Sequence, residues 1–193
     1  MRQPTPGFRI VSQSNQLQAF SQIKLALIIL VVASIAALFA WADWPLRGLA
    51  PGVQADRIII EKSAHQLTLM HLGSPLKQYT VALGRGALGP KEKEGDRKTP
   101  EGIYRILEHK RQSAFHLALR ISYPNEHDVA HANLLGVSPG SDIMIHGMKN
   151  GLGFLGRIHR WVDWTAGCIA VTNPEIDEIG RLVADGTPVE IRP

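Results

Sequence analysis

The apolar residues of this chain are arranged in two different ways along its length. Residues 25–42 form an unbroken apolar run without a charge, which predicts one long helix. From residue 56 onward, short runs in which apolar residues alternate with polar ones are bounded by Gly, Pro and Ser, a pattern typical of β-strands. These runs predict strands within residues 56–62, 65–72, 76–84, 103–109, 115–123, 142–147, 168–171 and 188–193.

One segment near the end of the sequence, TNPEIDEIGRLVADG, has the pattern of an amphipathic helix. Asn173 suits the cap of this helix, Pro174 its first position and Gly186 the residue that stops it. Its apolar residues recur with the spacing of one helical face: Ile176, Ile179 and Val183. Many short strands with one or two short helices favour an all-β fold, a sandwich or a barrel, for this part of the chain.

The apolar run is also long enough to cross a membrane, because about 20 apolar residues span a bilayer core. Basic residues precede it and no acidic residue does, so the positive-inside rule places the N-terminus in the cytoplasm and the rest of the chain outside. We therefore expect a cytoplasmic tail, a transmembrane signal-anchor, a linker and one exported domain: residues 1–22, 23–42, 43–56 and 57–193. Ala-Trp-Ala at residues 40–42 resembles a signal-peptidase site, so a cleaved signal peptide is the alternative.

Composition and charge narrow the classes of function. Of the 193 residues, 45% are hydrophobic and 20% are charged, which is ordinary for a globular domain and argues against wholesale disorder. The net charge is +4 and the basic residues are scattered, so we expect no basic face for nucleic acid. The chain has one cysteine, and in an exported protein a lone cysteine is a free thiol or a bridge to another molecule.

That cysteine, Cys168, lies between Gly167 and an apolar predicted strand. A thiol attacks as the thiolate and so needs a base, and His146 is placed for that task at the end of strand 142–147, directly before Gly147. Both side chains are then expected at strand ends on one rim, where the N–H groups of Gly167 and Cys168 can bind an oxyanion. From the residues alone, Cys–His acyl transfer stands beside the alternative of a core cysteine and a structural histidine.

Several motifs resemble, in the right order, those of YkuD-type L,D-transpeptidase catalytic domains: LGPKEKEGDRKTPEGIYRI, ISYPNEHDVAHA, IHG, DWTAGCIAVTN and NPEIDEI. The resemblance covers about residues 57–192. It implies that Cys168 is the nucleophile and His146 the general base. It also implies that Gly167 supports the oxyanion through backbone N–H groups, that the backbone at Gly147 orients the imidazole, and that GDRKTPEG is a structural turn.

The chain departs from the pattern of that family at two positions. Many members have a histidine two residues before the cysteine, where this chain has Ala166, and a polar residue two places after it, where this chain has Ala170. The oxyanion site is therefore expected to depend more on backbone donors. The stretch between His146 and Cys168 is also longer than is common, and its Gly-rich, aromatic sequence predicts a loop or lid over the site.

The resemblance implies an all-β sandwich or barrel of the L,D-transpeptidase catalytic type. It implies a cysteine acyltransferase that acts on peptidoglycan stem peptides through a thioester on Cys168, without a cofactor or metal. Together with the expected signal-anchor, it implies a single-pass protein of the bacterial inner membrane, with its catalytic domain in the periplasm and a part in cell-wall biogenesis and cell shape. The expected partners are peptidoglycan stems, with a wall-anchored protein as a further acceptor or substrate. A Cys-dependent hydrolase of the same fold and a non-enzymatic wall-binding module are the alternatives.

Other residues are candidates outside the Cys–His pair. His159, in the expected lid, is a candidate for contact with substrate or else an exposed loop histidine, and Tyr123 and His131 are candidates to line the substrate site. His127 and His131, four residues apart and close to Asp128, offer the ligands of a zinc peptidase. The surrounding sequence, YPNEHDVAHANL, has the pattern of a loop rather than a helix, which disfavours that metal site.

Overall fold

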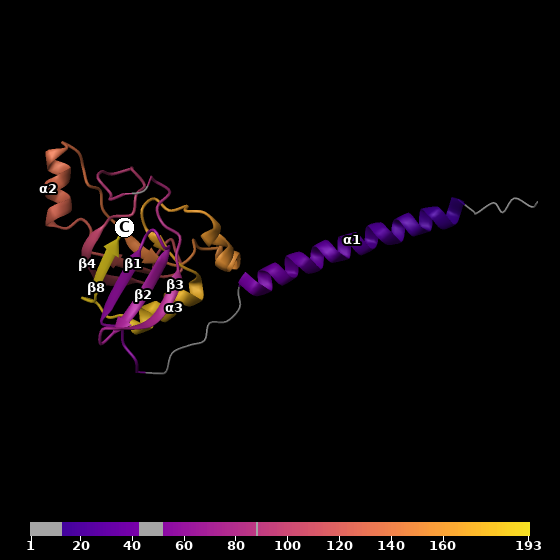
Figure 1. Cartoon of the computed structure of the whole chain (residues 1–193), viewed down its shortest axis with the longest axis horizontal. Coiled ribbons are helices and arrows are strands. Elements are labelled where there is room, and N and C mark those ends of the chain that lie inside the picture. Colours follow the sequence, from indigo (N-terminus) through magenta and orange to yellow (C-terminus); the bar gives the residue numbers. More distant parts are fainter. Residues whose placement is uncertain (1–12, 43–51, 88) are drawn as a thin grey trace, which may run out of the picture. The chain divides into compact units, whose positions relative to one another are not determined.

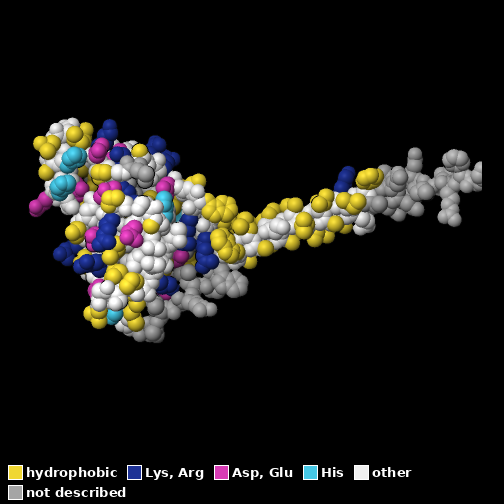
Figure 2. Space-filling view, in the orientation of Figure 1, with side chains coloured by type: hydrophobic (Ala, Val, Ile, Leu, Met, Phe, Trp, Pro, Cys, Tyr) yellow, Lys and Arg dark blue, Asp and Glu magenta, His cyan; other side chains and the backbone are white. Residues whose placement is uncertain are grey.

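The structure, a computed structural model, describes residues 13–42, 52–87 and 89–193 and separates into two units, one ending at Trp41 and one beginning at Ala42. The first unit is helix α1 (Gln13–Ala42) (Figure 1). Its stretch of 23 residues from Phe20 to Ala42 contains an 18-residue window with a mean hydropathy of 2.7, and it is long and apolar enough to cross a membrane. Hydrophobic side chains cover this stretch of the helix (Figure 2).

Helix α1 extends farther toward the N-terminus than the expected membrane span of residues 23–42. Residues 13–22, which we assigned to a polar tail, belong to α1. Most of the expected linker, residues 43–51, and residues 1–12 of the expected tail lie outside the described residues.

The second unit is built on a mixed sheet with eight strands in the described part of the chain. Their order across the sheet is β3-β2-β1-β8-β4-β5-β6-β7. The strands are β1 (Arg57–Glu61), β2 (Gln66–His71), β3 (Ser74–Thr80), β4 (Gly102–Lys110), β5 (Ala118–Ile121), β6 (Met144–His146), β7 (Ile169–Ala170) and β8 (Pro188–Arg192). Each lies within or overlaps a run in which we predicted a strand. Strands such as β1 and β8 bury one face and leave the other more exposed, which produces the alternation in the sequence.

The sheet curls until its two edges meet. Strands β1 and β8 run parallel, as do β6 and β7, and the other neighbouring strands run antiparallel. Just beyond β3, Ala82 exchanges two backbone hydrogen bonds with Ala170 of β7, with N···O distances of 2.9 and 2.8 Å. The sheet is therefore a barrel-like half-closed structure, and the prediction of an all-β domain with few helices is confirmed.

Helix α3 (Asn173–Leu182) covers one side of this sheet, and its Ile176 and Ile179 are fully buried in the core with the strand residues. The expected helix is present, but its cap is Thr172, whose side chain forms a capping box with Glu175, and not Asn173. The helix ends at Leu182, so Gly186 does not stop it. That glycine, at φ +85°, lies in the turn before β8.

The prediction of a loop at YPNEHDVAHANL is wrong, because residues Glu126–Leu134 form helix α2 (Figure 1). Its first turn is held by a capping box in which the side chains of Asn125 and Asp128 each accept a hydrogen bond from the backbone N–H of the other residue. Only Ala132 of this helix is buried, so the sequence shows no apolar stripe.

Candidate active site

Neighbouring strands bring the two candidate catalytic residues to one part of the sheet. His146 ends β6 and pairs in register with Ala170 of the parallel strand β7. Cys168 directly precedes β7, two positions before Ala170. Because strand side chains alternate between the faces of a sheet, Cys168 is placed on the same face as Ala170 and its partner His146.

Cys168 is a free thiol and is partly buried. Burial raises the pKa of this thiol, while a hydrogen bond from the backbone of Met144 and the charge of Lys91 act in the opposite direction. The sulfur also lies 3.6 Å from the carbonyl oxygen of Asp142, to which the thiol donates. The resting form is therefore the thiol, which requires a base to become a nucleophile.

His146 has the properties of that base. The side chain is buried, and its Nδ1 donates a hydrogen bond to the carbonyl oxygen of Gly147 at 2.6 Å. Burial lowers the pKa of His146 to about 4, so the imidazole is neutral at neutral pH. Since Nδ1 carries the proton, Nε2 carries the lone pair that can accept one. Phe115 stacks on the ring at 3.9 Å between centroids, and Trp164 meets it edge-on at 5.7 Å.

Gly147 is packed so tightly that a side chain would not fit. A Cβ atom there would lie 2.9 Å from Oδ1 of Asn173 and 2.9 Å from Cγ2 of Ile176. Asn173 also accepts a hydrogen bond from the backbone N–H of Met148 at 2.8 Å, so it fastens α3 to the end of β6 instead of capping the helix. The carbonyl that orients His146 is thereby held in place. Sequence reasoning missed this role of Asn173.

Gly167 has a conformation that only glycine adopts easily, with φ +130°. A Cβ atom there would lie 2.7 Å from the carbonyl oxygen of Lys98. Its N–H donates to the side-chain oxygen of Thr165 at 3.1 Å, and the Thr165 hydroxyl donates to the carbonyl of Cys168 at 2.7 Å. This N–H is thus engaged within the turn, which differs from the expectation that it is available to an oxyanion. Thr165, which shapes the turn, was not singled out from the sequence.

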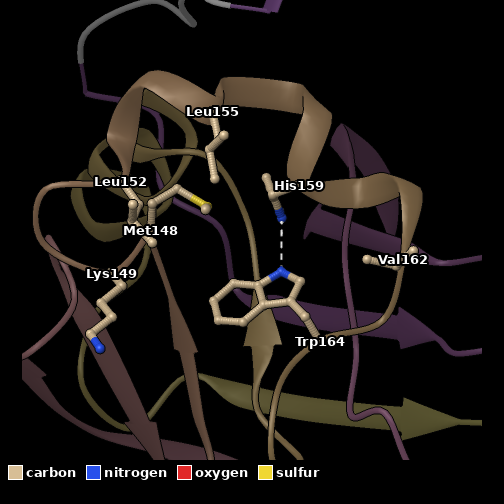
Figure 3. A pocket seen from close by; sticks show the side chains of 7 residues that line it. All are labelled: Met148, Lys149, Leu152, Leu155, His159, Val162 and Trp164. Atoms are coloured by element: carbon tan, nitrogen blue, oxygen red, sulfur yellow. Dashed lines mark hydrogen bonds between the residues drawn. The ribbon is translucent and has the colours of Figure 1, made fainter.

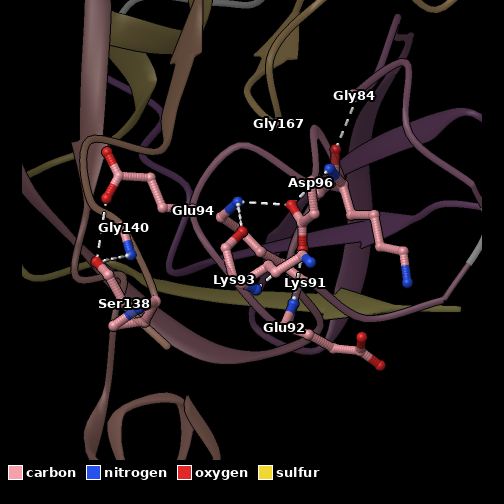
Figure 4. Close-up of polar contacts among 12 residues, drawn as sticks. Gly84, Lys91, Glu92, Lys93, Glu94, Asp96, Ser138, Gly140 and Gly167 are labelled. Carbon is pink, nitrogen blue, oxygen red and sulfur yellow. Dashed lines mark hydrogen bonds and ion pairs between the residues drawn. The ribbon is translucent and has the colours of Figure 1, made fainter. Parts of the chain in front are cut away.

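The loop beneath Gly167 is organised around Asp96 (Figure 4). The Asp96 carboxylate accepts hydrogen bonds from Nζ of Lys91 at 2.7 Å and from the backbone N–H of Lys98 at 3.0 Å. Two more backbone N–H groups donate to it, those of Glu92 and Lys93. Burial alone would raise the pKa of Asp96, but these hydrogen bonds lower it to about 2. The segment therefore acts as a structural turn that supports the loop before Cys168.

Two cavities lie near the Cys–His pair. One of about 420 Å³, which we call the loop cavity, lies next to Cys168. It is lined by Lys91, Glu94, Gly95, Arg97, Gly140, Ser141, Asp142, Ile143 and Ala166. The other, of about 330 Å³, is shown in Figure 3, and we call it the lid cavity. One of its lining residues, Trp164, contacts His146. It is lined by Met148, Lys149, Leu152, Leu155, His159, Val162 and Trp164.

The expected lid contains η1 (Gly153–Trp161), two 3₁₀ turns that meet at a kink at Gly156, where φ is +44°. His159 lies in it and is buried rather than exposed. Its Nδ1 accepts a hydrogen bond from Nε1 of Trp164 at 3.3 Å (Figure 3). Burial, aided by the nearby charge of Arg160, lowers the pKa of His159 to about 4.

The remaining candidates lie away from the pair. Tyr123 is buried, donates its hydroxyl to the carbonyl of Pro139 at 2.7 Å, and lines neither the loop cavity nor the lid cavity. His131 is exposed on α2 and lines neither of them. Asp128 accepts hydrogen bonds from Tyr104 and Asn125, and the described residues contain no cluster of three or more metal-binding side chains. The structure therefore gives no support to the zinc site.

Comparisons with known proteins point to one family. The YkuD family, described as an L,D-transpeptidase catalytic domain, matches residues 55–191. The Escherichia coli K12 protein YafK, which is named as a candidate L,D-transpeptidase, is 34% identical over 110 residues, which are 56% of this chain and 37% of YafK. The chain thus spans little more than a third of the length of that relative.

Two solved structures share the fold. Pgp2 of Campylobacter jejuni, a helical cell shape determining protein, aligns with a TM-score of 0.56 and 20% identity over 81% of this chain and 54% of its own. Bd1075 of Bdellovibrio bacteriovorus aligns with a TM-score of 0.50 and 24% identity over 75% of this chain and 50% of its own. At these identities the likeness concerns the fold alone.

Proposed function

Because the chain belongs to the YkuD family of L,D-transpeptidase catalytic domains, we propose that it is a cysteine acyltransferase of peptidoglycan stem peptides, with Cys168 as nucleophile and His146 as general base. The observation that carries the proposal is the register of β6 and β7. It sets a neutral, oriented imidazole beside the strand that the free thiol precedes.

In the first half-reaction, Nε2 of His146 takes the proton of Cys168, and the sulfur attacks the amide carbonyl of the third, L-centred link of a tetrapeptide stem. The backbone N–H of Cys168 is the donor we assign to the oxyanion, since that of Gly167 is bound to Thr165. Protonated His146 then gives its proton to the departing nitrogen of the terminal D-alanine. The C–N bond breaks and a thioester remains on Cys168.

In the second half-reaction, an amine attacks the thioester and the C–S bond breaks. His146 takes the proton from the incoming nitrogen and returns it to the sulfur, so the enzyme ends as it began. The amine of another stem gives a 3→3 crosslink, and the amine of a wall-anchored protein gives an attached protein. The reaction needs no metal or cofactor, because the thiol, the base and backbone donors supply every step.

We place the catalytic domain in the periplasm of a bacterium, held to the inner membrane by α1. The apolar 23-residue stretch of that helix and the basic residues before it support this placement. A role in cell-wall biogenesis and cell shape would match the description of Pgp2 as a cell shape determining protein.

The test uses the full chain in detergent with a carbapenem and, separately, with a tetrapeptide stem. Intact mass should show one adduct on the wild-type protein, none on Cys168→Ala, and a strongly slowed adduct on His146→Gln. His131→Gln, an exposed histidine on α2, is the matched control and should react like the wild type.

Muropeptide analysis in cells separates the candidate activities. New 3→3 crosslinks that vanish with Cys168→Ala support the transferase. Loss of crosslinks or release of wall protein would instead indicate a Cys-dependent hydrolase. An unchanged wall in both variants, together with no adduct on Cys168, would leave only a non-enzymatic wall-binding module.

A further inference from the structure

The outward face of the lid is apolar, although it points away from the core. One face of η1 packs on the domain, since His159 is buried and Leu155 lines the lid cavity. The opposite face of a surface helix is ordinarily polar. Here Trp161 and Val162 are each 66% exposed and Phe154 is 54% exposed. We call these three residues the outer lid patch, because large apolar side chains exposed within one short segment are typical of an interaction surface.

The segment around this patch is also basic. Residues 143–162 contain no Asp or Glu, and they contain Lys149, Arg157 and Arg160. Lys149 lines the lid cavity together with Val162 of the patch, and Arg157 lies in η1 itself, so positive charge adjoins the apolar side chains. Trp and Phe together with Lys and Arg are typical of segments that lie in the headgroup region of an anionic membrane.

The backbone that carries the patch is fastened to the domain. Arg160, next to Trp161, forms an ion pair with Glu175 in the first turn of α3, and both side chains of the pair are largely buried. Trp164 donates a hydrogen bond to His159 of the lid. The patch is therefore presented by an ordered segment, and a surface that binds it does not have to offset the entropy of ordering the lid.

The connection between α1 and the domain is short. Residues 43–51 separate Ala42 of α1 from Gly52, the next described residue. A stretch of that length reaches at most about 35 Å. A domain of about 140 residues has a radius of gyration of about 14 Å, so its diameter is similar to this reach. A membrane that holds α1 therefore stays within reach of the domain surface, which makes docking an intramolecular event at a high effective concentration.

A second copy of the chain fits this surface less well than a membrane does. A two-fold dimer through the patch would bring the same basic segment of each copy together. Residues 143–162 hold no acidic residue that could offset the repulsion between them. Anionic lipid headgroups complement the charge, and the headgroup region also accepts the three apolar side chains.

We propose that the outer lid patch docks on the surface of the membrane that holds α1. Phe154, Trp161 and Val162 lie in the headgroup region, and Lys149 and Arg157 pair with anionic lipid headgroups. The inference rests on the membrane anchor of the proposed function and is independent of the chemistry of Cys168. In Figure 1, η1 lies on the far side of the domain from α2, so α2 is a reference segment that such docking leaves in water.

The experiment places the full chain in lipid nanodiscs at one chain per disc, which excludes contact with a second copy. One set of discs is phosphatidylcholine alone, and the other contains about one-third phosphatidylglycerol. Backbone amide exchange is followed by mass spectrometry in residues 20–42, 126–134 and 152–162. We expect residues 152–162 to exchange about tenfold more slowly in the anionic discs than in the neutral ones, and α2 to exchange alike in both. At about 1 M salt the Debye length is about 3 Å, so the difference should disappear.

Two variants test the named side chains. Arg157→Glu should remove the difference between the two lipids, and Trp161→Ser should reduce the slowing in the anionic discs about tenfold. Leu134→Ser, a residue that is 87% exposed on α2, and Arg111→Glu, an exposed arginine outside the lid, are the matched controls and should behave like the wild type. The denaturation midpoint of each variant in detergent checks that the domain is folded.

Equal exchange of residues 152–162 in the two lipids would overturn the inference, because a cover supplied by the chain itself does not depend on lipid charge. A lipid difference that persists in folded Arg157→Glu would overturn it as well. Slow exchange of residues 20–42 in both sets of discs shows that the anchor is inserted. If those residues exchange freely, the membrane placement under the proposed function fails and the docking surface with it. The carbapenem adduct on Cys168 tests the proposed chemistry separately.

Discussion

Trp164 donates its indole N–H to Nδ1 of His159, and the same indole meets the His146 ring edge-on. The position of the His146 ring is therefore linked to the lid through one aromatic side chain. Replacing Trp164 with Phe keeps a ring but removes the donor, leaving a buried nitrogen of His159 unpaired. We expect the free energy of unfolding to fall by about 1–3 kcal/mol. Denaturant titration of the full chain measures the change. Trp161→Phe, an exposed ring in the same lid, should have little effect.

We expect a larger loss of unfolding free energy when the ion pair between Arg160 and Glu175 is removed than when Trp164 is replaced with Phe. Arg160→Met would leave the carboxylate of Glu175 buried without its cation, at a cost of about 3–5 kcal/mol of unfolding free energy. Arg120→Met is the matched control, since the Arg120–Glu108 pair is much more exposed and its loss should cost less than about 1 kcal/mol. Similar losses in the two variants would show that the lid is not fastened by this pair.

We expect the substitution Gly167→Ala to lower activity because it distorts the backbone before Cys168. Alanine at this position is strained at φ +130° and would press against the carbonyl of Lys98. Gly167→Ala should lower acylation by about 100-fold or more and the unfolding free energy by about 3 kcal/mol. In Gly73→Ala, at φ +77°, the added methyl meets no atom within 4 Å, so only the strain remains. If both variants acylate alike, the close approach at Gly167 does not matter for catalysis.

The rate of acylation should depend on pH through His146. Burial lowers the pKa of this histidine to about 4, so the neutral base persists well below neutral pH. We expect kcat/KM to be flat from about pH 7 to 5 and to fall about tenfold per pH unit below 4. Rates measured after brief exposure to acid and return to pH 7 control for unfolding. An acid limb centred near 6.5 would mean that the imidazole is solvated.

Stability should also depend on pH, through His146 and His159 together. The pKa of each is lowered from 6.5 to about 4, so between these values the unfolded state binds more protons than the folded state. Their contribution is fully present above about pH 6.5 and is lost as the pH falls toward 4. The unfolding free energy should decrease by up to about 1.4 kcal/mol per pH unit for each histidine. His159→Phe should halve this slope, and a slope equal to that of the wild type would contradict the prediction.

The strands could be predicted from the sequence, because a strand that buries one face has apolar and polar residues in alternation. Helix α2 could not, since only Ala132 is buried and the start of the helix is marked by the Asn125–Asp128 capping box within a turn-like sequence. Cys168 and His146 were singled out by their places at strand ends, but it was the resemblance to the family motifs that assigned them as candidate nucleophile and base. The sequence did not reveal that Thr165 binds the Gly167 N–H or that Asp96 organises the supporting loop. Both roles depend on the geometry of turns, which the periodicity of apolar residues does not predict. Tyr123 was expected to line the substrate site, but its hydroxyl donates a hydrogen bond to the carbonyl of Pro139 and its side chain packs in the core.

The strand order has a consequence for how the molecule assembles during synthesis. β8 lies between β1 and β4, so it joins the hairpins formed early in the sequence to the strands that hold His146 and Cys168. Residues 188–192 are made after all the others that form the sheet, and until they dock, the two halves lack their shared neighbour. β6, which ends in His146, and β7, which follows Cys168, pair with each other without β8, but β4 keeps an open edge until β8 docks. That edge is a row of unpaired backbone groups, which a strand of another chain can occupy in the meantime.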